Sequence, residues 1–207
     1  MKYDVIIVAA GKGKRANLGY NKVFFKMENN KTVLENSASL FIEDPDCSKI
    51  IIVTEEEDKV FKNDKVLITK GGEQRPDSVN NGLLLSESEY VFIHDGARPF
   101  LTKQDLEKLK QEVVKSDAAI LAKKAIDTVK YVKEGIIQET LDRNNIYLAL
   151  TPQAFKTKLL KEAYENVDVA SCTDDASVVE NYNHPVKIVE GDPSNIKLTN
   201  TDDFKNI

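Results

Sequence analysis

The sequence predicts an α/β protein built on a mostly parallel central sheet. Short apolar runs rich in β-branched residues recur along the 207-residue chain, and segments with helical periodicity separate them. The first run, residues 5–8, leads directly into a loop that contains two glycines and four cations. A strand that is apolar throughout is typical of a sheet covered on both faces. In open sheets of this kind, ligands bind at the carboxyl ends of the strands.

Residues 9–22 form the first candidate ligand loop. Gly11 and Gly13 allow backbone N–H groups to face phosphate oxygens, while Arg15 and Lys22 supply positive charge. The loop lacks the Lys-Ser/Thr pair of a Walker P-loop, and it matches the dinucleotide fingerprint only in its alanine variant. We therefore predict a polyphosphate ligand. The alternative is a strand-to-loop crossover whose lysines are solvated surface residues.

Further strands are predicted from short apolar runs that turn residues separate. Because these runs alternate with helical segments, they indicate strand-helix-strand units. The predicted strands cover residues 49–53, 66–69, 90–94, 118–122, 186–190 and 196–199.

Helices are predicted where apolar residues recur at three- and four-residue spacing after a capping side chain or a turn. The first covers residues 32–41, and the fourth follows the Thr151-Pro152-Gln153 turn. After the helix at 32–41, a second helix is predicted to be capped by Ser78 and to carry Val79, Leu83 and Leu84. A third is predicted to begin with a capping box at Thr102 and to carry Leu106, Leu109 and Val113. The fourth carries Phe155, Leu159, Leu160 and Ala163, and the fifth is capped by residues 173–175.

Two further strand ends carry polar residues. The glycines at 71 and 72 allow the backbone to approach a ligand closely, and Arg75 adds a cation; a plain turn before a helix is the alternative. Asp95 follows the strand at 90–94 as a single carboxylate. Mg²⁺ commonly takes one or two carboxylates and fills its other positions with phosphate and water, so Asp95 is a candidate ligand. An ion pair with Arg98 that closes the turn is the alternative.

Residues 127–141 depart from this alternation. Two polar strands flank a Lys-Glu-Gly turn whose glycine suits a left-handed backbone, which predicts a β-hairpin within an arm of about residues 126–148. The hairpin is too polar to lie in the core. A two-stranded ribbon is marginal by itself, so we expect it to pack against another surface, and a second copy of the chain is the simplest partner.

Lys197 stands between apolar neighbours in the last predicted strand. In a strand, Ile196 and Leu198 share one face and Lys197 points to the other. If that other face is buried, Lys197 must meet an anion; otherwise it is an ordinary surface lysine.

The composition excludes several classes of protein. With 41% hydrophobic and 30% charged residues, no stretch approaches the ~18 apolar residues of a membrane helix, and the amino-terminal run is a strand rather than a signal peptide. Cys47 and Cys172 lie far apart without a CxxC motif, which fits a reducing cytoplasm and disfavours a disulfide scaffold or a zinc site. The net charge of −5 leaves no basic footprint for nucleic acid, so we expect a small anionic substrate.

Nine short motifs follow one another along nearly the whole chain: AAGKGKR, NK at 21–22, GGEQRPDSV, HDGARPF, DTVK, LDR, LTPQAF, TDDAS and EGDPSNIKLT. In type and order these motifs resemble those of the 2-C-methyl-D-erythritol 4-phosphate cytidylyltransferases. The resemblance implies one domain over residues 1–207 with a Rossmann-like nucleotidyltransferase fold, and a homodimer formed through the arm. It also implies transfer of a cytidylyl group from CTP to methylerythritol phosphate with Mg²⁺, a cytoplasmic step of non-mevalonate isoprenoid precursor synthesis.

The resemblance also implies roles for individual residues that match the motifs. Catalytic roles fall to Arg15, Lys22 and Lys197, with Lys197 at the α-phosphate, and Asp95 is the acid on the metal side. CTP would be bound by Ala9, Ala10, Gly11, Gly13, Gly72, Glu73, Arg75 and Ser78. The second substrate would be held by Arg98, Thr128, Arg143, Thr151 and Thr173, with Arg143 of the partner subunit reaching across.

Three other functions compete with this interpretation. Ribitol-5-phosphate cytidylyltransferases share the fold and most CTP motifs, but the DGARP motif and the DTVK and LDR stretches look more like the methylerythritol enzyme. A sugar-1-phosphate nucleotidyltransferase is disfavoured by the match over residues 128–155. A nucleotide-sensing module would need the pocket but not all of Arg15, Lys22, Asp95 and Lys197, which suit stabilisation of a transition state.

Overall fold

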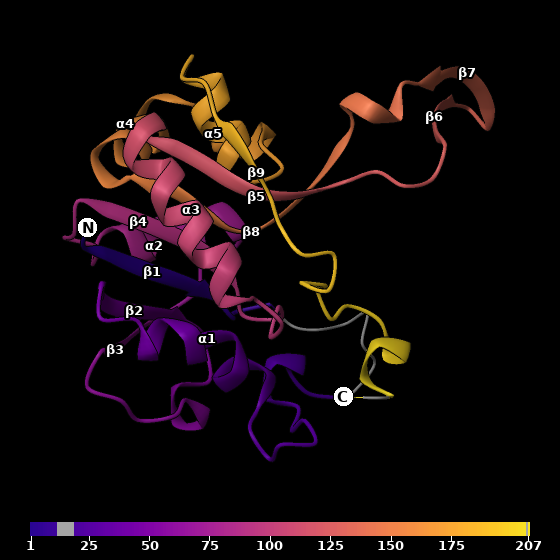
Figure 1. Ribbon diagram of the computed structural model, residues 1–207. Helices are drawn as coiled ribbons and strands as arrows, with labels where there is room; N and C mark the ends of the chain where they lie inside the picture. Colours follow the sequence, from indigo (N-terminus) through magenta and orange to yellow (C-terminus); the bar gives the residue numbers. More distant parts are fainter. Residues whose placement is uncertain (12–18, 206) are drawn as a thin grey trace.

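The computed structural model describes residues 1–11, 19–205 and 207, and these form a seven-stranded sheet with the order β3-β2-β1-β4-β8-β5-β9 (Figure 1). Neighbouring strands run parallel except at β8, which is antiparallel to both β4 and β5. The predicted mostly parallel α/β sheet is therefore confirmed. The strands of this sheet are β1 (Tyr3–Val8), β2 (Cys47–Val53), β3 (Val66–Thr69), β4 (Tyr90–Asp95), β5 (Ala118–Lys124), β8 (Tyr147–Lys156) and β9 (Lys187–Glu190).

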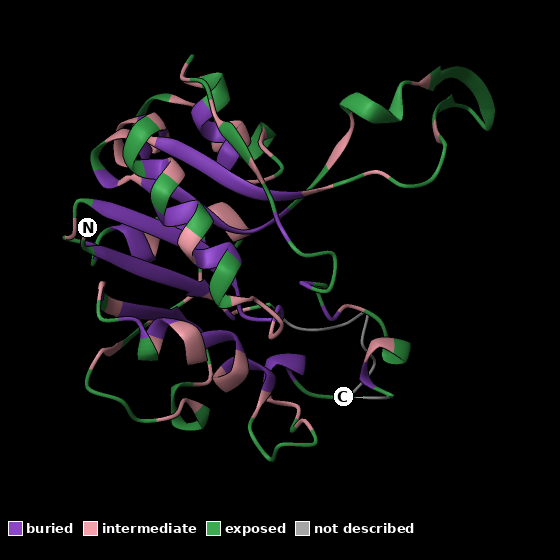
Figure 2. Cartoon of the chain, viewed as in Figure 1, coloured by how far each residue is buried: buried purple, intermediate pink, exposed green. Residues whose placement is uncertain are grey.

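Helices cover both faces of the sheet, and the buried residues form a core on each face (Figure 2). Successive side chains of a strand point to opposite faces, so Val5 and Ile7 of β1 join one core while Ile6 joins the other. The first core takes residues from α1 and α3, and the second from α2, α4 and α5. The helices are α1 (Val33–Glu43), α2 (Arg75–Leu83), α3 (Lys103–Ser116), α4 (Thr157–Asn166) and α5 (Asp175–Asn181).

Capping side chains begin the helices largely as predicted. Thr32 and Glu35 form a complete capping box at α1. At α3, Thr102 accepts a hydrogen bond from the backbone N–H of Asp105, but the carboxylate of Asp105 accepts from the backbone of Asp192 instead of closing the box. A tertiary hydrogen bond from Asp192 therefore replaces one of the two hydrogen bonds of the capping box predicted at Thr102.

The helix predicted to contain Phe155 begins only at Thr157, because residues up to 156 belong to β8. Phe155 pairs with β4 and β5 and is fully buried. Proline is disfavoured in a central strand because it cannot donate to the ladder. Pro152 is accommodated where the register between β5 and β8 shifts, since the paired residues of β8 pass from Gln153 to Ala149 there.

The predicted cap at Ser78 is also wrong, because α2 begins earlier, at Arg75, with Gln74 as its N-cap. Pro76 lies in the first turn, where its missing N–H is tolerated. Ser78 instead accepts a hydrogen bond from the backbone of Gly72 at 3.0 Å and thereby holds the preceding loop. Leu84, predicted to belong to this helix, is its C-cap and is 74% exposed.

The strand predicted at residues 196–199 is absent from the described part of the chain, where these residues run as irregular backbone. Leu198 is fully buried and its N–H donates to the carbonyl of Ala97, whereas Ile196 is 40% exposed. The two side chains therefore do not share a face, and this segment is held by single tertiary hydrogen bonds rather than by a ladder.

The predicted hairpin is present as β6 (Val129–Lys133) and β7 (Ile136–Leu141), which pair only with each other. Glu134 and Gly135 have φ angles of 51° and 78°, the left-handed backbone that a tight hairpin turn requires. The arm projects away from the central sheet (Figure 1) and exposes the side chains of Tyr131, Ile136 and Ile137. Its packing against a second copy stays a prediction.

Two further expectations concern the chain as a whole. Across residues 1–11, 19–205 and 207, no helix combines the length and apolar content that a bilayer span requires. Cys47, which is buried, and Cys172, which is partly buried, are both free thiols.

Candidate active site

A cavity of about 580 Å³ opens at the carboxyl ends of β1 and β4. The chain adds β2 and β3 on one side of β1 and then places β4 on the other, so β1 and β4 flank the switch point of the sheet. Ligands of doubly wound sheets bind in the crevice at such a point. The cavity is lined by Val8, Ala9, Ala10, Gly11, Asn21, Lys22, Val23, Gly72, Glu73, Gln74, Arg75, Ser78, Asp95, Ala97 and Lys197.

Most residues predicted to bind CTP line this one cavity. They are Ala9, Ala10, Gly11, Gly72, Glu73, Arg75 and Ser78. Lys22 and Lys197, predicted to be catalytic, line it too, although they are far apart in the chain. Gly13 and Arg15 lie outside the described residues. The expectation that distant cations gather at one edge of the sheet is thus met for Lys22 and Lys197.

Asn21 holds the segment that carries Lys22. Its side-chain amide donates to the carbonyl of Ala9 at 2.7 Å, which ties the segment to the end of β1. Asn21 also caps the short 3₁₀ helix Lys22–Phe24, so Lys22, itself only 9% exposed, follows a fixed residue. In the sequence, Asn21 stands only as part of the NK motif, and no function was predicted for it.

Three positively charged side chains surround the carboxylate of Asp95 at this edge of the sheet. This carboxylate lies 2.9 Å from Nζ of Lys197, 3.4 Å from Nε of Arg98 and 3.9 Å from Nε of Arg75. Burial by itself raises the pKa of Asp95, but the charges of Lys197, Arg75 and Arg98 outweigh burial and lower that pKa to about 2. Asp95 is therefore ionised at neutral pH. Lys197 is exposed rather than buried, with a side chain 38% accessible, yet it still pairs with this carboxylate.

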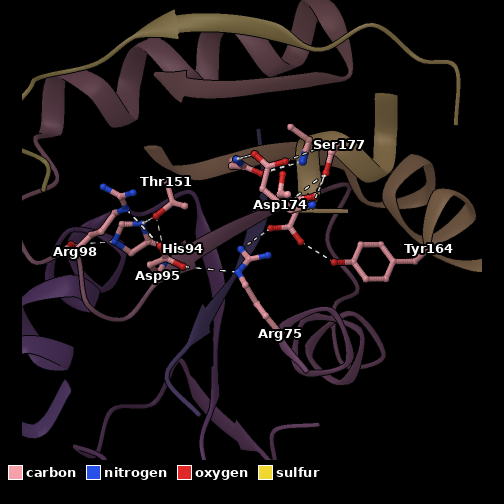
Figure 3. Close-up of polar contacts among 12 residues, drawn as sticks. Arg75, His94, Asp95, Arg98, Thr151, Tyr164, Asp174 and Ser177 are labelled. Carbon is pink, nitrogen blue, oxygen red and sulfur yellow. Dashed lines mark hydrogen bonds and ion pairs between the residues drawn. The ribbon is translucent and has the colours of Figure 1, made fainter. Parts of the chain in front are cut away.

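Thr151 holds the backbone of Asp95 and is itself in contact with His94 (Figure 3). The hydroxyl of Thr151 accepts from the N–H of Asp95 at 3.0 Å and lies 3.0 Å from Nδ1 of His94, while Nε2 of His94 lies 3.2 Å from the carbonyl of Arg98. The tautomer protonated at Nε2 satisfies all three contacts. Complete burial lowers the pKa of His94 to about 4, so the ring is neutral and structural.

The free energy of unfolding is expected to fall as the pH drops from about 6.5 towards 4. The pKa of His94 is about 4 in the folded protein, against an ordinary value of 6.5 for histidine. Between these values the unfolded state binds more protons, so acidification favours unfolding. Denaturant titrations near pH 7 and near pH 5 measure the difference.

His94→Gln is the test variant, and His184→Gln is its control. His184 is partly exposed, and Nδ1 of its ring lies 3.0 Å from the neighbouring carbonyl of Pro185. His94→Gln should lower the stability at neutral pH and weaken the pH dependence, while His184→Gln should leave both as in the wild type. An unchanged pH dependence in His94→Gln would contradict the assignment.

Arg75 is held by a buried carboxylate that the sequence analysis assigned only to a helix cap. Nη2 of Arg75 lies 2.7 Å from Oδ2 of Asp175, which is fully buried, and the hydroxyl of Tyr164 donates to Oδ1 at 2.6 Å (Figure 3). Arg75 and Asp175 are 100 residues apart, and Tyr164 lies on a third element, α4. No local pattern in the sequence links these three residues.

Two residues of the cavity wall are glycines, and the packing around them differs. A Cβ on Gly72 would lie 2.1 Å from Cβ of Asp77, so the packing of the loop against α2 excludes any larger residue. Among the described residues, a Cβ on Gly11 would meet no atom within 4 Å, and the backbone of Gly11 is not in the left-handed region. Packing thus requires glycine at position 72, whereas no contact of the described residues requires it at position 11.

The residues predicted to hold the second substrate do not line the cavity of this single chain. Arg98 is buried and donates to the carbonyl of Asn195 at 2.8 Å, and Thr151 is buried behind Asp95. Thr173 is exposed before α5. Thr128 and Arg143 are exposed at the base of the arm, where Nη1 of Arg143 donates to the carbonyl of Ile126 at 2.7 Å. These five positions therefore form two groups, one that supports Asp95 and one at the surface.

Asn195 links the first group to Lys197 and was also missed. Its amide donates to the carbonyl of Thr151 and its own carbonyl accepts from Arg98. The hydrogen bond from Leu198 to Ala97 follows directly after Lys197. Lys197 is therefore held between two anchored residues. Within the described residues, Oδ1 of Asn195 is the one buried side-chain oxygen or nitrogen without a hydrogen bond.

The residues present fit a metal ion only in one mode. Within the described part of the chain, no group of three or more His, Cys, Asp or Glu side chains could hold a metal ion. Asp95 is a single ionised carboxylate on the cavity wall. One carboxylate suffices when phosphate oxygens and water complete the octahedral shell of Mg²⁺. The site thus fits a metal that enters with a nucleotide, and does not fit one held by the protein alone.

Comparison with known proteins places the chain in a family. The family model IspD, 2-C-methyl-D-erythritol 4-phosphate cytidylyltransferase, matches residues 3–206. The 2-C-methyl-D-erythritol 4-phosphate cytidylyltransferase of Geobacillus kaustophilus is 40% identical, over 99% of this chain and 94% of the relative. The crystal structure of the Francisella tularensis enzyme of the same name superposes with a TM-score of 0.87 at 35% identity, over 99% of this chain and 97% of that one.

A second solved structure, that of the Thermus thermophilus cytidylyltransferase of the same name, gives a TM-score of 0.83 at 27% identity and covers 99% of this chain and 96% of that chain. Sequence and structure therefore match over the full length of the proteins compared. The resemblance predicted from the ordered motifs is confirmed. This chain is a member of the 2-C-methyl-D-erythritol 4-phosphate cytidylyltransferase family.

Proposed function

We propose that this protein transfers a cytidylyl group from CTP to 2-C-methyl-D-erythritol 4-phosphate, forming 4-CDP-2-C-methyl-D-erythritol and diphosphate. The observation that carries the proposal is that Lys22, Lys197, Asp95 and the described residues of the predicted CTP pocket line a single cavity at the switch point of the sheet. The reaction is a step of non-mevalonate isoprenoid precursor synthesis, and we expect it to take place in the cytoplasm.

The chemistry is an in-line attack of a substrate phosphate oxygen on the α-phosphorus of CTP. The new P–O bond forms as the bond from the α-phosphorus to the bridging oxygen breaks, and diphosphate leaves with that oxygen. The attacking phosphate is already an anion, so no general base is needed. The neutral, buried and fully hydrogen-bonded His94 is consistent with this.

The barrier is then chiefly electrostatic, because two anions must meet and charge builds on the phosphate oxygens. Lys22 and Lys197 on the cavity wall, with Arg15 from the loop beyond Gly11, would stabilise that charge. Asp95 holds Lys197 at 2.9 Å and so orders one of these cations before the substrate arrives. Mg²⁺ bound beside Asp95 would neutralise part of the triphosphate charge.

We further propose that residues 1–207 form one domain and that the arm exchanges with a second copy to make a homodimer. The single central sheet, whose strands come from both ends of the chain, supports one domain. The exposed apolar side chains of the arm and the position of Arg143 outside the cavity of its own chain support the exchange. Arg143 of the partner subunit would then complete the site for the second substrate.

Arg143→Ala is expected to raise KM for methylerythritol phosphate by about tenfold or more while KM for CTP changes by less than about twofold, because a bidentate guanidinium–phosphate contact is lost. Steady-state kinetics with each substrate varied in turn measure the two constants. Lys130→Ala, which removes another exposed cation of the arm, is the control and should change neither. Equal losses for both substrates in Arg143→Ala would count against a phosphate anchor. Arg143→Lys is not a mild variant, since lysine lacks the fork.

The activity itself is tested by release of diphosphate from Mg-CTP with separate acceptors. We expect release with methylerythritol phosphate and not with ribitol 5-phosphate or a hexose 1-phosphate. Release with ribitol 5-phosphate instead would assign the protein to the related cytidylyltransferases. CTP binding without release in the presence of any acceptor would indicate a nucleotide-binding module.

A further inference from the structure

Arg75 occupies a constrained position on the cavity wall. It is the first residue of α2, and its side chain is 29% exposed and lies between two carboxylates from different elements. Asp175 of α5 accepts from Nη2 at 2.7 Å, and Asp95 at the end of β4 lies 3.9 Å from Nε. An arginine side chain loses rotamer entropy when it is ordered. Because the two carboxylates already hold Arg75, that entropy is lost before any ligand binds.

Asp175 is fixed independently of Arg75. The hydroxyl of Tyr164 donates to its second oxygen at 2.6 Å, so both carboxylate oxygens are engaged. The start of α5 is tied to the sheet by Gln153 of β8, whose side chain donates to Asp174 and accepts from the backbone of Ala176. Gln153 is 1% exposed. Since Asp175 is held from the sheet and from α4, it is the anchor, and the partly exposed Arg75 is the group that it orients.

The buried partner also changes what Arg75 contributes to the cavity. Asp175 is fully buried and next to the guanidinium, so it compensates much of the positive charge there. A compensated arginine recognises a ligand through the directions of its N–H donors rather than through net charge. Its effect on binding then depends on orientation, and orientation depends on the residues behind it.

We propose that Asp175 and Tyr164 are positioning residues for CTP, acting through Arg75. Neither residue lines the cavity, yet both set the guanidinium that does. The proposal rests on the proposed function, in which Arg75 belongs to the CTP site. The alternative is a purely structural brace that holds α4 and α5 on α2 and the sheet.

Equilibrium binding of Mg-CTP by calorimetry separates the two. Tyr164→Phe removes one hydroxyl and should raise the Kd for CTP by about 3- to 10-fold, and Asp175→Asn by about 10- to 100-fold, the range for a lost hydrogen bond to a charged group. In an Arg75→Lys background, which lacks the fork, Tyr164→Phe should change the Kd by less than about twofold. Tyr182→Phe is the control, since the hydroxyl of Tyr182 makes no hydrogen bond within the described residues and the side chain packs on the same core.

A structural brace predicts a lower Tm in Tyr164→Phe with an unchanged Kd for CTP, or the same change in Kd in both backgrounds, and either result would overturn the proposal. Should Asp175→Asn fail to fold, the Tyr164→Phe pair decides alone. If the wild-type protein binds CTP but releases no diphosphate with any acceptor, the proposed function fails while the comparison of Kd values still tests the positioning of Arg75.

Discussion

Replacing Lys197 with alanine is expected to lower kcat by on the order of 10²–10³, the usual effect of removing one preorganised charge donor from a transition state. Nζ of Lys197 lies on the cavity wall, 2.9 Å from the ionised Asp95, so the cation is in place before the reaction begins. Lys22 lies far from Lys197 in the chain but lines the same cavity, so Lys22→Ala should lower kcat by a similar factor. Rates of diphosphate release at saturating CTP and acceptor give kcat directly.

Lys205→Ala is the matched control for the lysine variants. Lys205 is 66% exposed and pairs with Asp202 outside the cavity, so its loss should leave kcat within about twofold. A melting curve of each variant tests whether that protein is folded. A kcat near the wild-type value in both Lys22→Ala and Lys197→Ala would exclude the proposed electrostatic role.

Asp95→Asn is expected to lower both activity and stability. The variant keeps the shape of the side chain but removes the charge that balances Lys197, Arg75 and the buried Arg98. Breaking a buried ion pair by removing one partner costs about 3–5 kcal/mol when the other charge stays uncompensated. Because Arg98 is 9% exposed, we expect the lower end of that range, a fall in Tm of about 6–12 °C for a chain of this length.

The same change should reduce kcat by on the order of 10²–10³, because Lys197 loses its anchor and the proposed Mg²⁺ would lose its carboxylate. Thermal unfolding and diphosphate release, measured well below the Tm of the variant, separate the two effects. Asp202→Asn, at a carboxylate that is 82% exposed, should change neither. An Asp95→Asn protein with wild-type Tm would show that Arg98 does not depend on Asp95.

The features that the sequence predicted correctly depend on neighbouring residues. The apolar run at 5–8 was enough to predict a buried strand, and the glycine-rich loop after it predicted a ligand edge, because both are read within a few residues. The Glu134-Gly135 turn is equally local, since its left-handed backbone follows from the glycine and the alternating flanks. The ordered motifs identified the family, whose model matches residues 3–206.

The errors occurred where distant partners override local preference. Residues around Phe155 have helical spacing, and Pro152 argues against a strand, yet pairing with β4 and β5 makes this segment an interior strand of the sheet. Ile196 and Leu198 alternate like a strand, but no strand among the residues that the structure describes pairs with them. In both cases the decisive hydrogen bonds come from residues far away in the chain.

The sequence by itself determined which charged residues the protein has, the order in which they follow the strands and the family to which the chain belongs. Only the tertiary structure decided which charges compensate one another. Asp175 stabilises Arg75 from 100 residues away, and Asp95 meets Lys197 across the end of the sheet. Hydrogen bonds and ion pairs act over a few ångströms of space, and separation along the chain carries no information about such distances until the strands have packed.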